Sequence, residues 1–97
     1  MIVHIVLFKL IRTDIDIVDS FIKELLKLKV LSYYIEFEVV TKTSIIKTDL
    51  DGDVILFSLF ENEEKLQSYM TDQKHLQIIN RTSKFIDKKY VLDYSRI

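Results

Sequence analysis

A tyrosine, an aspartate and a histidine occur together in the stretch YMTDQKH, residues 69–75. His75 is one of two histidines in the chain, and a neutral imidazole is the side chain best suited to accept a proton near pH 7. Tyr69 carries a phenol that can donate a hydrogen bond to a developing enolate. Such a pair could serve an aldol or isomerisation reaction on a polarised carbonyl compound without a metal.

The spacing of this pair decides whether the two side chains can act together. In one continuous helix, positions six apart lie about 240° apart around the axis, on different faces. Thr71 and Asp72 are poor residues for a helix interior and good helix caps. We therefore expect the chain to bend there, with Tyr69 at the end of one helix and His75 in the first turn of the next.

Two further polar residues lie on predicted strands. His4 belongs to the apolar first strand, on a face that we expect helices to cover. Asp93 lies on the last strand, where its carboxylate could orient a histidine by accepting its second N–H. The candidate catalytic set is thus His75 as the base, Tyr69 as the hydrogen-bond donor or acid, His4 as an auxiliary polar group and Asp93 as a positioning group.

Ordinary structural roles stay open for all four residues. His75 could lie at the surface near a helix terminus, and Tyr69 could be a core tyrosine with its hydroxyl at the edge. His4 could be a buried, hydrogen-bonded strand residue, and Asp93 a structural carboxylate. A metal site built from His4, Asp72, His75 and Asp93 is a weaker alternative, because the two histidines lack the i, i+4 spacing of helical metal sites. We expect no metal and no other cofactor.

The composition is that of one globular domain over residues 1–97. The chain is 48% hydrophobic and 30% charged, and its net charge of −1 gives no broad positive field for nucleic acid. The lysines near the C-terminus, Lys84, Lys88 and Lys89, are interpreted as solvated. Cysteine is absent, which excludes disulfides and thiolate chemistry and fits a reducing cytoplasm.

The apolar start of the chain is too short to span a membrane. It runs for about eight residues, whereas a bilayer needs ~20. It also has no basic leader and no small-residue cleavage site, so it does not resemble a signal peptide. We therefore expect a cytoplasmic protein without a membrane or nucleic-acid partner.

Apolar spacing and turn residues predict seven elements. The strands are expected at residues 2–10, 30–42, 53–60 and 88–95, and the helices at 14–28, 63–70 and 73–86. Asn62 and Asp72 are predicted N-caps, and Thr13 with Asp16 has the arrangement of a capping box. Residues 43–52 are expected to be a connection, which could border the mouth of a pocket.

The order of these elements predicts an α+β fold. A β-α-β-β-α-β chain is the ferredoxin-like arrangement, with four antiparallel strands and helices on one face of the sheet. The strands IVHIVLF and VILFSLF are apolar on both faces, although a sheet covered on one side should alternate. We therefore predict a homodimer in which two open sheet faces cover each other. The alternative is a monomer that tolerates exposed apolar positions.

Several spaced residues resemble the stress-responsive dimeric α/β-barrel (Dabb) family. Members commonly carry His-x-Val-x-Phe-Lys on the first strand, Tyr-x-x-His-Pro-x-His after the third, and Val-Asp-Tyr at the end. The matching positions here are His4, Val6, Phe8, Lys9, Tyr69, His75, Asp93 and Tyr94. Two features depart from the family pattern: Asp72-Gln73 replaces the His-Pro pair, and LKLKVLS (residues 26–32) replaces an Ile-Pro-Gly link.

The resemblance implies a ferredoxin-like protomer that pairs into a barrel between two sheets. Many members are stress-associated stable dimers without an assigned reaction. Some relatives are cofactor-free polyketide cyclases, whose tyrosine and histidine in a pocket between sheet and helices correspond to Tyr69 and His75, with His4 in the same pocket.

Three functions follow as hypotheses. The first is a dimer that binds a small apolar or carbonyl-containing ligand, and the second is an acid–base cyclase or isomerase. The third is a purely structural stress dimer. Related haem-degrading and antibiotic-biosynthesis monooxygenases are a further alternative, but the chain has no tryptophan, which the haem-degrading relatives typically use.

Overall fold

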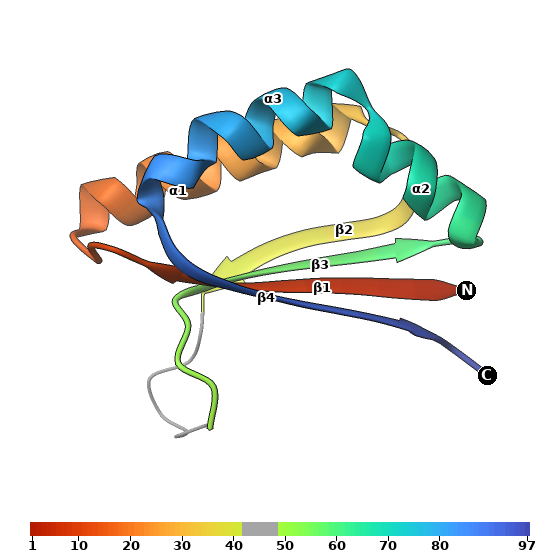
Figure 1. Ribbon diagram of the computed structural model, residues 1–97, viewed down its shortest axis with the longest axis horizontal. Coiled ribbons are helices and arrows are strands. Elements are labelled where there is room, and N and C mark those ends of the chain that lie inside the picture. Colours follow the sequence, from red (N-terminus) through yellow and green to blue (C-terminus); the bar gives the residue numbers. More distant parts are fainter. Residues whose placement is uncertain (42–48) are drawn as a thin grey trace.

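The computed structural model describes residues 1–41 and 49–97, which form one four-stranded antiparallel sheet with helices on one face (Figure 1). The elements in chain order are β1 (Ile2–Leu10), α1 (Ile15–Leu26), the 3-10 helix η1 (Lys27–Val30), β2 (Tyr34–Thr41), β3 (Val54–Phe60), α2 (Glu63–Thr71), α3 (Gln73–Thr82), the 3-10 helix η2 (Ser83–Phe85) and β4 (Ile86–Ser95). The predicted ferredoxin-like α+β fold is confirmed, with two consecutive helices where the second helical unit was expected.

The sheet places β1 at its centre. The strand order is β2-β3-β1-β4, so β1 pairs with both β3 and β4. His4 on β1 lies opposite Ser58 on β3 and opposite Asp93 on β4. This register brings the two ends of the chain together at one point of the sheet, beneath the helices.

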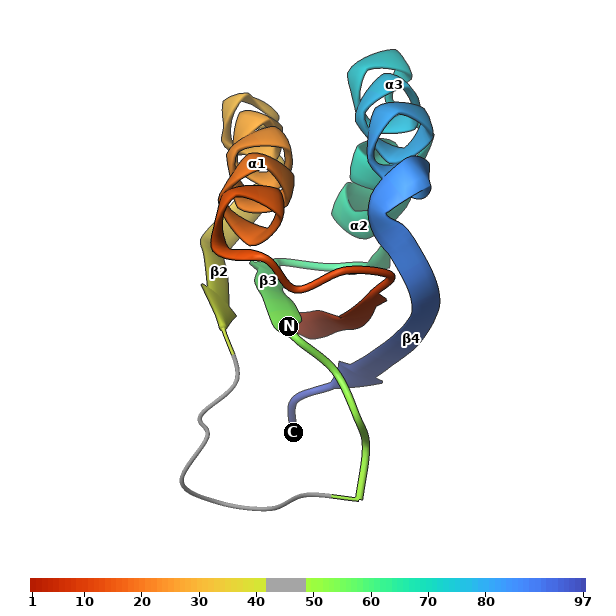
Figure 2. The same cartoon turned by 90° about the vertical axis from the view of Figure 1, so that its left-hand side faces the viewer.

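The core lies between the sheet and the helices. Side chains alternate between the two faces of a strand, and the even-numbered residues of β1 are all buried under the helices. Phe8 meets Phe21 of α1 edge to face, with 5.0 Å between ring centroids. Figure 2 shows α1 over one half of the sheet and the α2–α3 unit over the other.

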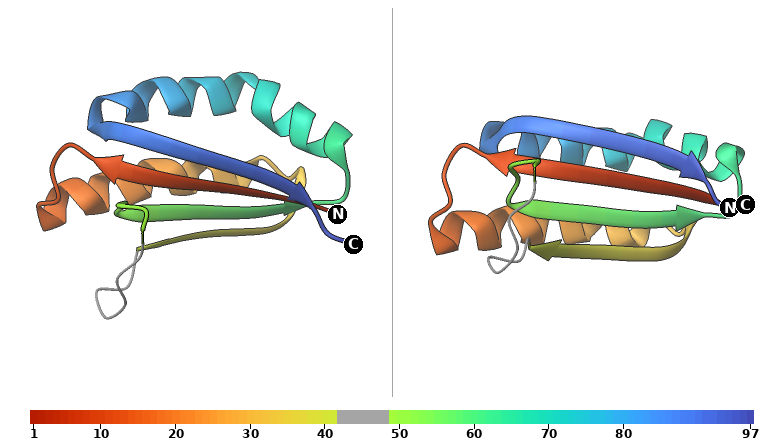
Figure 3. Two further views of the ribbon diagram at one scale, coloured as in Figure 1. Left: turned by 60° about the horizontal axis from the view of Figure 1, so that its bottom comes forward. Right: turned by 90° about the horizontal axis from the view of Figure 1, so that it is seen from below.

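The other face of the sheet has no helix on it (Figure 3). The register places three apolar side chains of β4 on this face, and all three are exposed: Tyr90, Leu92 and Tyr94. Ile55 and Phe57 of β3 lie on the same face and are half-buried. The face is therefore an apolar surface open to solvent in a single chain.

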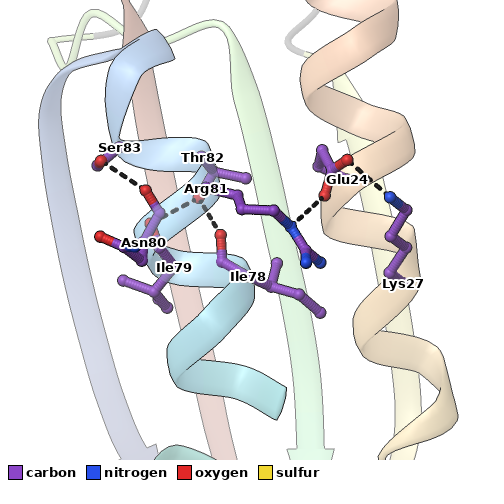
Figure 4. Close-up of polar contacts among 8 residues, drawn as sticks. All are labelled: Glu24, Lys27, Ile78, Ile79, Asn80, Arg81, Thr82 and Ser83. Carbon is purple, nitrogen blue, oxygen red and sulfur yellow. Dashed lines mark hydrogen bonds and ion pairs between the residues drawn. The ribbon is translucent and has the colours of Figure 1, made fainter. Parts of the chain in front are cut away.

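Polar contacts join the two helical columns at their outer surface (Figure 4). The Glu24 carboxylate accepts hydrogen bonds from Arg81 Nε of α3 at 3.2 Å and from Lys27 Nζ at 2.7 Å. The hydroxyl of Thr82 donates to the carbonyl of Ile78, 2.9 Å away.

Within the described residues, no helix is both long and apolar enough to cross a membrane.

Some predicted boundaries were wrong. The capping box is absent: Asp14 is the N-cap of α1, and no side chain caps that end. The second strand begins at Tyr34 rather than at residue 30, because the chain first forms η1 and buries Leu28 and Leu31 against the helices. The expected connection at 43–52 lies mostly outside the described residues.

Candidate active site

The bend between Tyr69 and His75 is present, and one carboxylate holds it. Asp72 ends α2 and caps α3, with extended backbone angles (φ −63°, ψ 136°). Its side chain accepts the backbone N–H of Lys74 at 2.8 Å and the hydroxyl of Tyr33 at 2.8 Å. Both bonds hold the pKa of Asp72 below its usual range, and the bond from Lys74 has the larger effect. Asp72 thus fixes the turn with its side chain.

The bend brings the two predicted catalytic rings together. The rings of Tyr69 and His75 meet edge to face, with 4.6 Å between their centroids. Both side chains are buried: Tyr69 is 1% exposed and His75 is 4% exposed. The interpretation of His75 as a surface histidine is therefore wrong, because the break at Asp72 turns it toward the sheet.

His4 approaches the same pair from the sheet. Its ring centroid lies 6.2 Å from that of Tyr69, and the side chain is 3% exposed. His4 Nδ1 is hydrogen-bonded to the carboxylate of Asp93 on the neighbouring strand. When Nδ1–H donates to this carboxylate, Nε2 is the nitrogen with a free lone pair. The sequence-based assignment of Asp93 as an acceptor for a histidine agrees with this contact.

A cavity of about 230 Å³ lies against these rings. His4, Tyr69 and His75 line it, together with apolar side chains from the sheet and from α1 and α3, among them Val6, Leu25 and Ile78. Asp93 does not line the cavity and acts on it only through His4. The cavity therefore presents one polar cluster within an otherwise mostly apolar wall.

The electrostatics keep both Tyr69 and His75 neutral. Burial is the main cause that lowers the pKa of His75 to about 4, and repulsion from His4 and Lys89 acts in the same direction. Burial raises the pKa of Tyr69 above its ordinary value, and nearby Tyr34 acts in the same direction. His75 Nδ1 is buried and has no hydrogen-bond partner among the described residues. A neutral imidazole with an unused nitrogen thus lies beside a protonated phenol.

Two features of the site were not predicted. Lys89 is exposed, as the interpretation of it as a solvated lysine predicts, but it also lines the cavity. The sequence signal for this position is strand periodicity: Lys89, Val91 and Asp93 are two residues apart on β4 and therefore share the face toward the helices. The hydrogen bond from Tyr33 to Asp72 was also missed, because 39 residues separate the two. Among the residues that the structure describes, no group of three or more possible metal ligands comes together.

Comparison with known proteins agrees with this fold. The family model of the stress responsive A/B barrel domain, Dabb, matches residues 2–96, and the chain therefore belongs to the Dabb family. No curated protein matches the sequence.

Solved structures share the fold at low sequence identity. A Dabb family protein with a ferredoxin-like fold from Mesorhizobium loti has a TM-score of 0.87 and 19% identity, and the match covers 99% of this chain and 96% of that one. A dimeric ferredoxin-like protein of unknown function from Thermobifida fusca has a TM-score of 0.82 and 15% identity, covering 98% and 90%. A hydroxynitrile lyase from Passiflora edulis has a TM-score of 0.77 and 18% identity, covering 96% and 90%.

Proposed function

We propose that this Dabb protein binds a small, mostly apolar ligand with a carbonyl group in the cavity between the sheet and α3. The observation that carries the proposal is the pairing of Tyr69 and His75 in the wall of an otherwise mostly apolar cavity. Such a wall gives the apolar body of a ligand a place to lie, and the Tyr69 hydroxyl is a hydrogen-bond donor for its carbonyl group. We further propose that the protein is a single domain that works in the cytoplasm.

The size of the cavity sets the scale of the ligand. An apolar cavity of about 150 Å³ accommodates benzene, so 230 Å³ suits about nine non-hydrogen atoms. Acetophenone has this size and joins an aromatic ring to a ketone. Its carbonyl oxygen would accept the hydroxyl proton of Tyr69 in a hydrogen bond, while the ring contacts the aliphatic wall.

Binding of acetophenone tests this proposal by calorimetric titration. Ile79 lines the cavity from α3, so Ile79→Phe should fill it and weaken binding at least tenfold. Leu76 lies on the same helix but is 51% exposed and outside the cavity, which makes Leu76→Phe the matched control. Equal affinity of the two variants, or no binding by the unaltered protein, would refute the proposal.

A second candidate function is acid–base catalysis on the bound carbonyl compound. The specific observation in its favour is a His75 that is neutral at pH 7 and adjacent to a protonated Tyr69. His75 would take a proton from the carbon next to the carbonyl, and the electrons of that C–H bond would form the enolate. The Tyr69 hydroxyl would donate a hydrogen bond to the enolate oxygen, and His4 would add a second polar contact. One structure with this fold is named a hydroxynitrile lyase, so the fold is compatible with an enzyme.

Exchange of the acetophenone methyl protons for deuterium in D₂O tests this step without knowledge of the natural substrate. Catalysed exchange should fall by at least tenfold in Tyr69→Phe and further in His75→Ala, whereas binding persists. The circular dichroism spectrum of each variant controls for folding. Exchange that is no faster with the protein than with buffer would leave ligand binding as the function.

We also propose that the protein is a homodimer through the open face of the sheet. The support is the row of exposed apolar side chains on β4, Tyr90, Leu92 and Tyr94, on the face without helices. Two copies of such a face would remove this surface from water. The structure from Thermobifida fusca is described as dimeric.

The oligomeric state in analytical ultracentrifugation tests this interface. Leu92→Lys should convert the dimer to a monomer, because the substitution would bury a charge between the sheets. Leu76→Lys, on the outer surface of α3, is the control and should stay dimeric. A monomeric unaltered protein, or a dimeric Leu92→Lys variant, would contradict the proposed interface.

A further inference from the structure

Lys89 is the one formally charged side chain that lines the cavity, which has no carboxylate in its described wall. The residue lies opposite Phe8 in the sheet, on the face that the helices cover. Its ammonium is close enough to repel a proton on His75. Lys89 is exposed at the edge strand, so its aliphatic stem borders the cavity while its charge stays hydrated.

The other polar groups near this end of the wall are already engaged. The Thr82 hydroxyl donates to the carbonyls of Ile78 and Ile79, at 2.9 and 3.1 Å. The Ser83 hydroxyl donates to the carbonyl of Asn80 at 2.7 Å (Figure 4). Lys89, in contrast, makes no ion pair with any residue in the described part of the chain. Its three N–H donors are therefore available to a ligand.

We propose that the ligand of this cavity is a small apolar carboxylic acid whose carboxylate binds the ammonium of Lys89 while its apolar body lies between α3 and the sheet. This inference rests on the proposed ligand-binding function and adds the chemical class of the ligand. An ammonium at the edge of a largely apolar cavity with no acidic side chain favours an anion over a neutral molecule of equal shape. A ligand of this class that also carries a ketone would place that group toward Tyr69 and His75.

Benzoate, benzamide and acetophenone test the inference, because they have the same number of non-hydrogen atoms and differ in charge. Their affinities should be measured by calorimetry at low ionic strength, where the charge of Lys89 is least screened. Benzoate should bind about tenfold more tightly than benzamide, as expected for one charge-assisted contact partly exposed to water. Lys89→Met should abolish this preference, so that benzoate binds this variant no more tightly than benzamide does.

Lys23→Met is the matched control, since Lys23 is exposed on α1 and lies outside the cavity. This variant removes the same charge from the protein and should keep the tenfold preference. A second readout follows His75: benzoate should raise the pKa of its imidazole, because an anion offsets the repulsion from Lys89, whereas benzamide should not.

The outcomes separate the inference from the proposed function. Equal affinity for benzoate and benzamide, or a preference that survives in Lys89→Met, would overturn the carboxylate inference while ligand binding stands. A preference lost equally in Lys23→Met would also overturn it, because the effect would then come from net charge. Failure of all three compounds to bind would overturn both the inference and the proposed function.

Discussion

Protonation of His75 should destabilise the folded protein by an amount that can be worked out from its burial. The pKa of His75 is lowered to about 4 in the folded state, whereas a free imidazole has a pKa near 6.5. The unfolded chain therefore binds more protons than the folded one between these two values. At 1.36 kcal/mol for each pKa unit, the difference amounts to about 3 kcal/mol.

The sign and the pH window follow from the lowered pKa. The full stability is present above pH 6.5, where His75 is neutral in both states. It falls as the pH decreases toward 4, and below pH 4 this contribution becomes constant because both states are then protonated. Against a total stability of about 5–15 kcal/mol for a typical domain, a loss of this size should be plainly visible.

Urea unfolding at a series of pH values between 7.5 and 4.5 is the assay, at one fixed protein concentration because a dimer unfolds in a concentration-dependent manner. The control is His75→Gln, which keeps the aspartates and glutamates that also titrate at low pH. The unfolding free energy of the unaltered protein should fall by about 2.5 kcal/mol more than that of His75→Gln across this range. Parallel pH profiles for the two proteins would refute the burial argument.

Three further predictions concern the fold that positions the site. Asp72→Ala should lower Tm by about 5 °C, because α3 loses its cap and Tyr33 its acceptor, and an unchanged melting curve would contradict this role. Gly52→Ala should lower the free energy of unfolding by about 1 kcal/mol, since the added Cβ would lie 2.3 Å from Leu7 Cδ1. In a Leu7→Ala background the same change should leave the free energy of unfolding, measured in urea, unchanged. Arg81→Met should leave the urea midpoint of unfolding unchanged, because the ion pair between Arg81 and Glu24 is exposed. A clear fall of this midpoint would contradict a minor role for the ion pair.

Local signals in the sequence identify much of this fold. Asn62 caps α2 by accepting the backbone N–H of Lys65 at 2.9 Å, as its position before two acidic residues predicts. Asp72 likewise marks the break on which the site depends. These predictions succeed because a cap depends only on the residues next to it.

Features set by tertiary packing are harder to predict. The second strand was expected to start at residue 30, but Leu28 and Leu31 are drawn into the core and the chain there forms η1. The position of Lys89 in the cavity wall depends on the register of β4 against β1, which brings together residues far apart in the chain. Periodicity shows that a strand exists, but it does not show which neighbour a given residue meets.

Tyr69 and His75 line one cavity, and we propose that this cavity receives a ligand. The most direct test is an isotope-filtered NMR experiment with labelled protein and unlabelled acetophenone. Intermolecular NOEs are expected from acetophenone to the ring of Tyr69 and to the methyl groups of Ile78 and Ile79, which line the cavity. NOEs only to the outer face of the sheet, for example to Leu92, would contradict it.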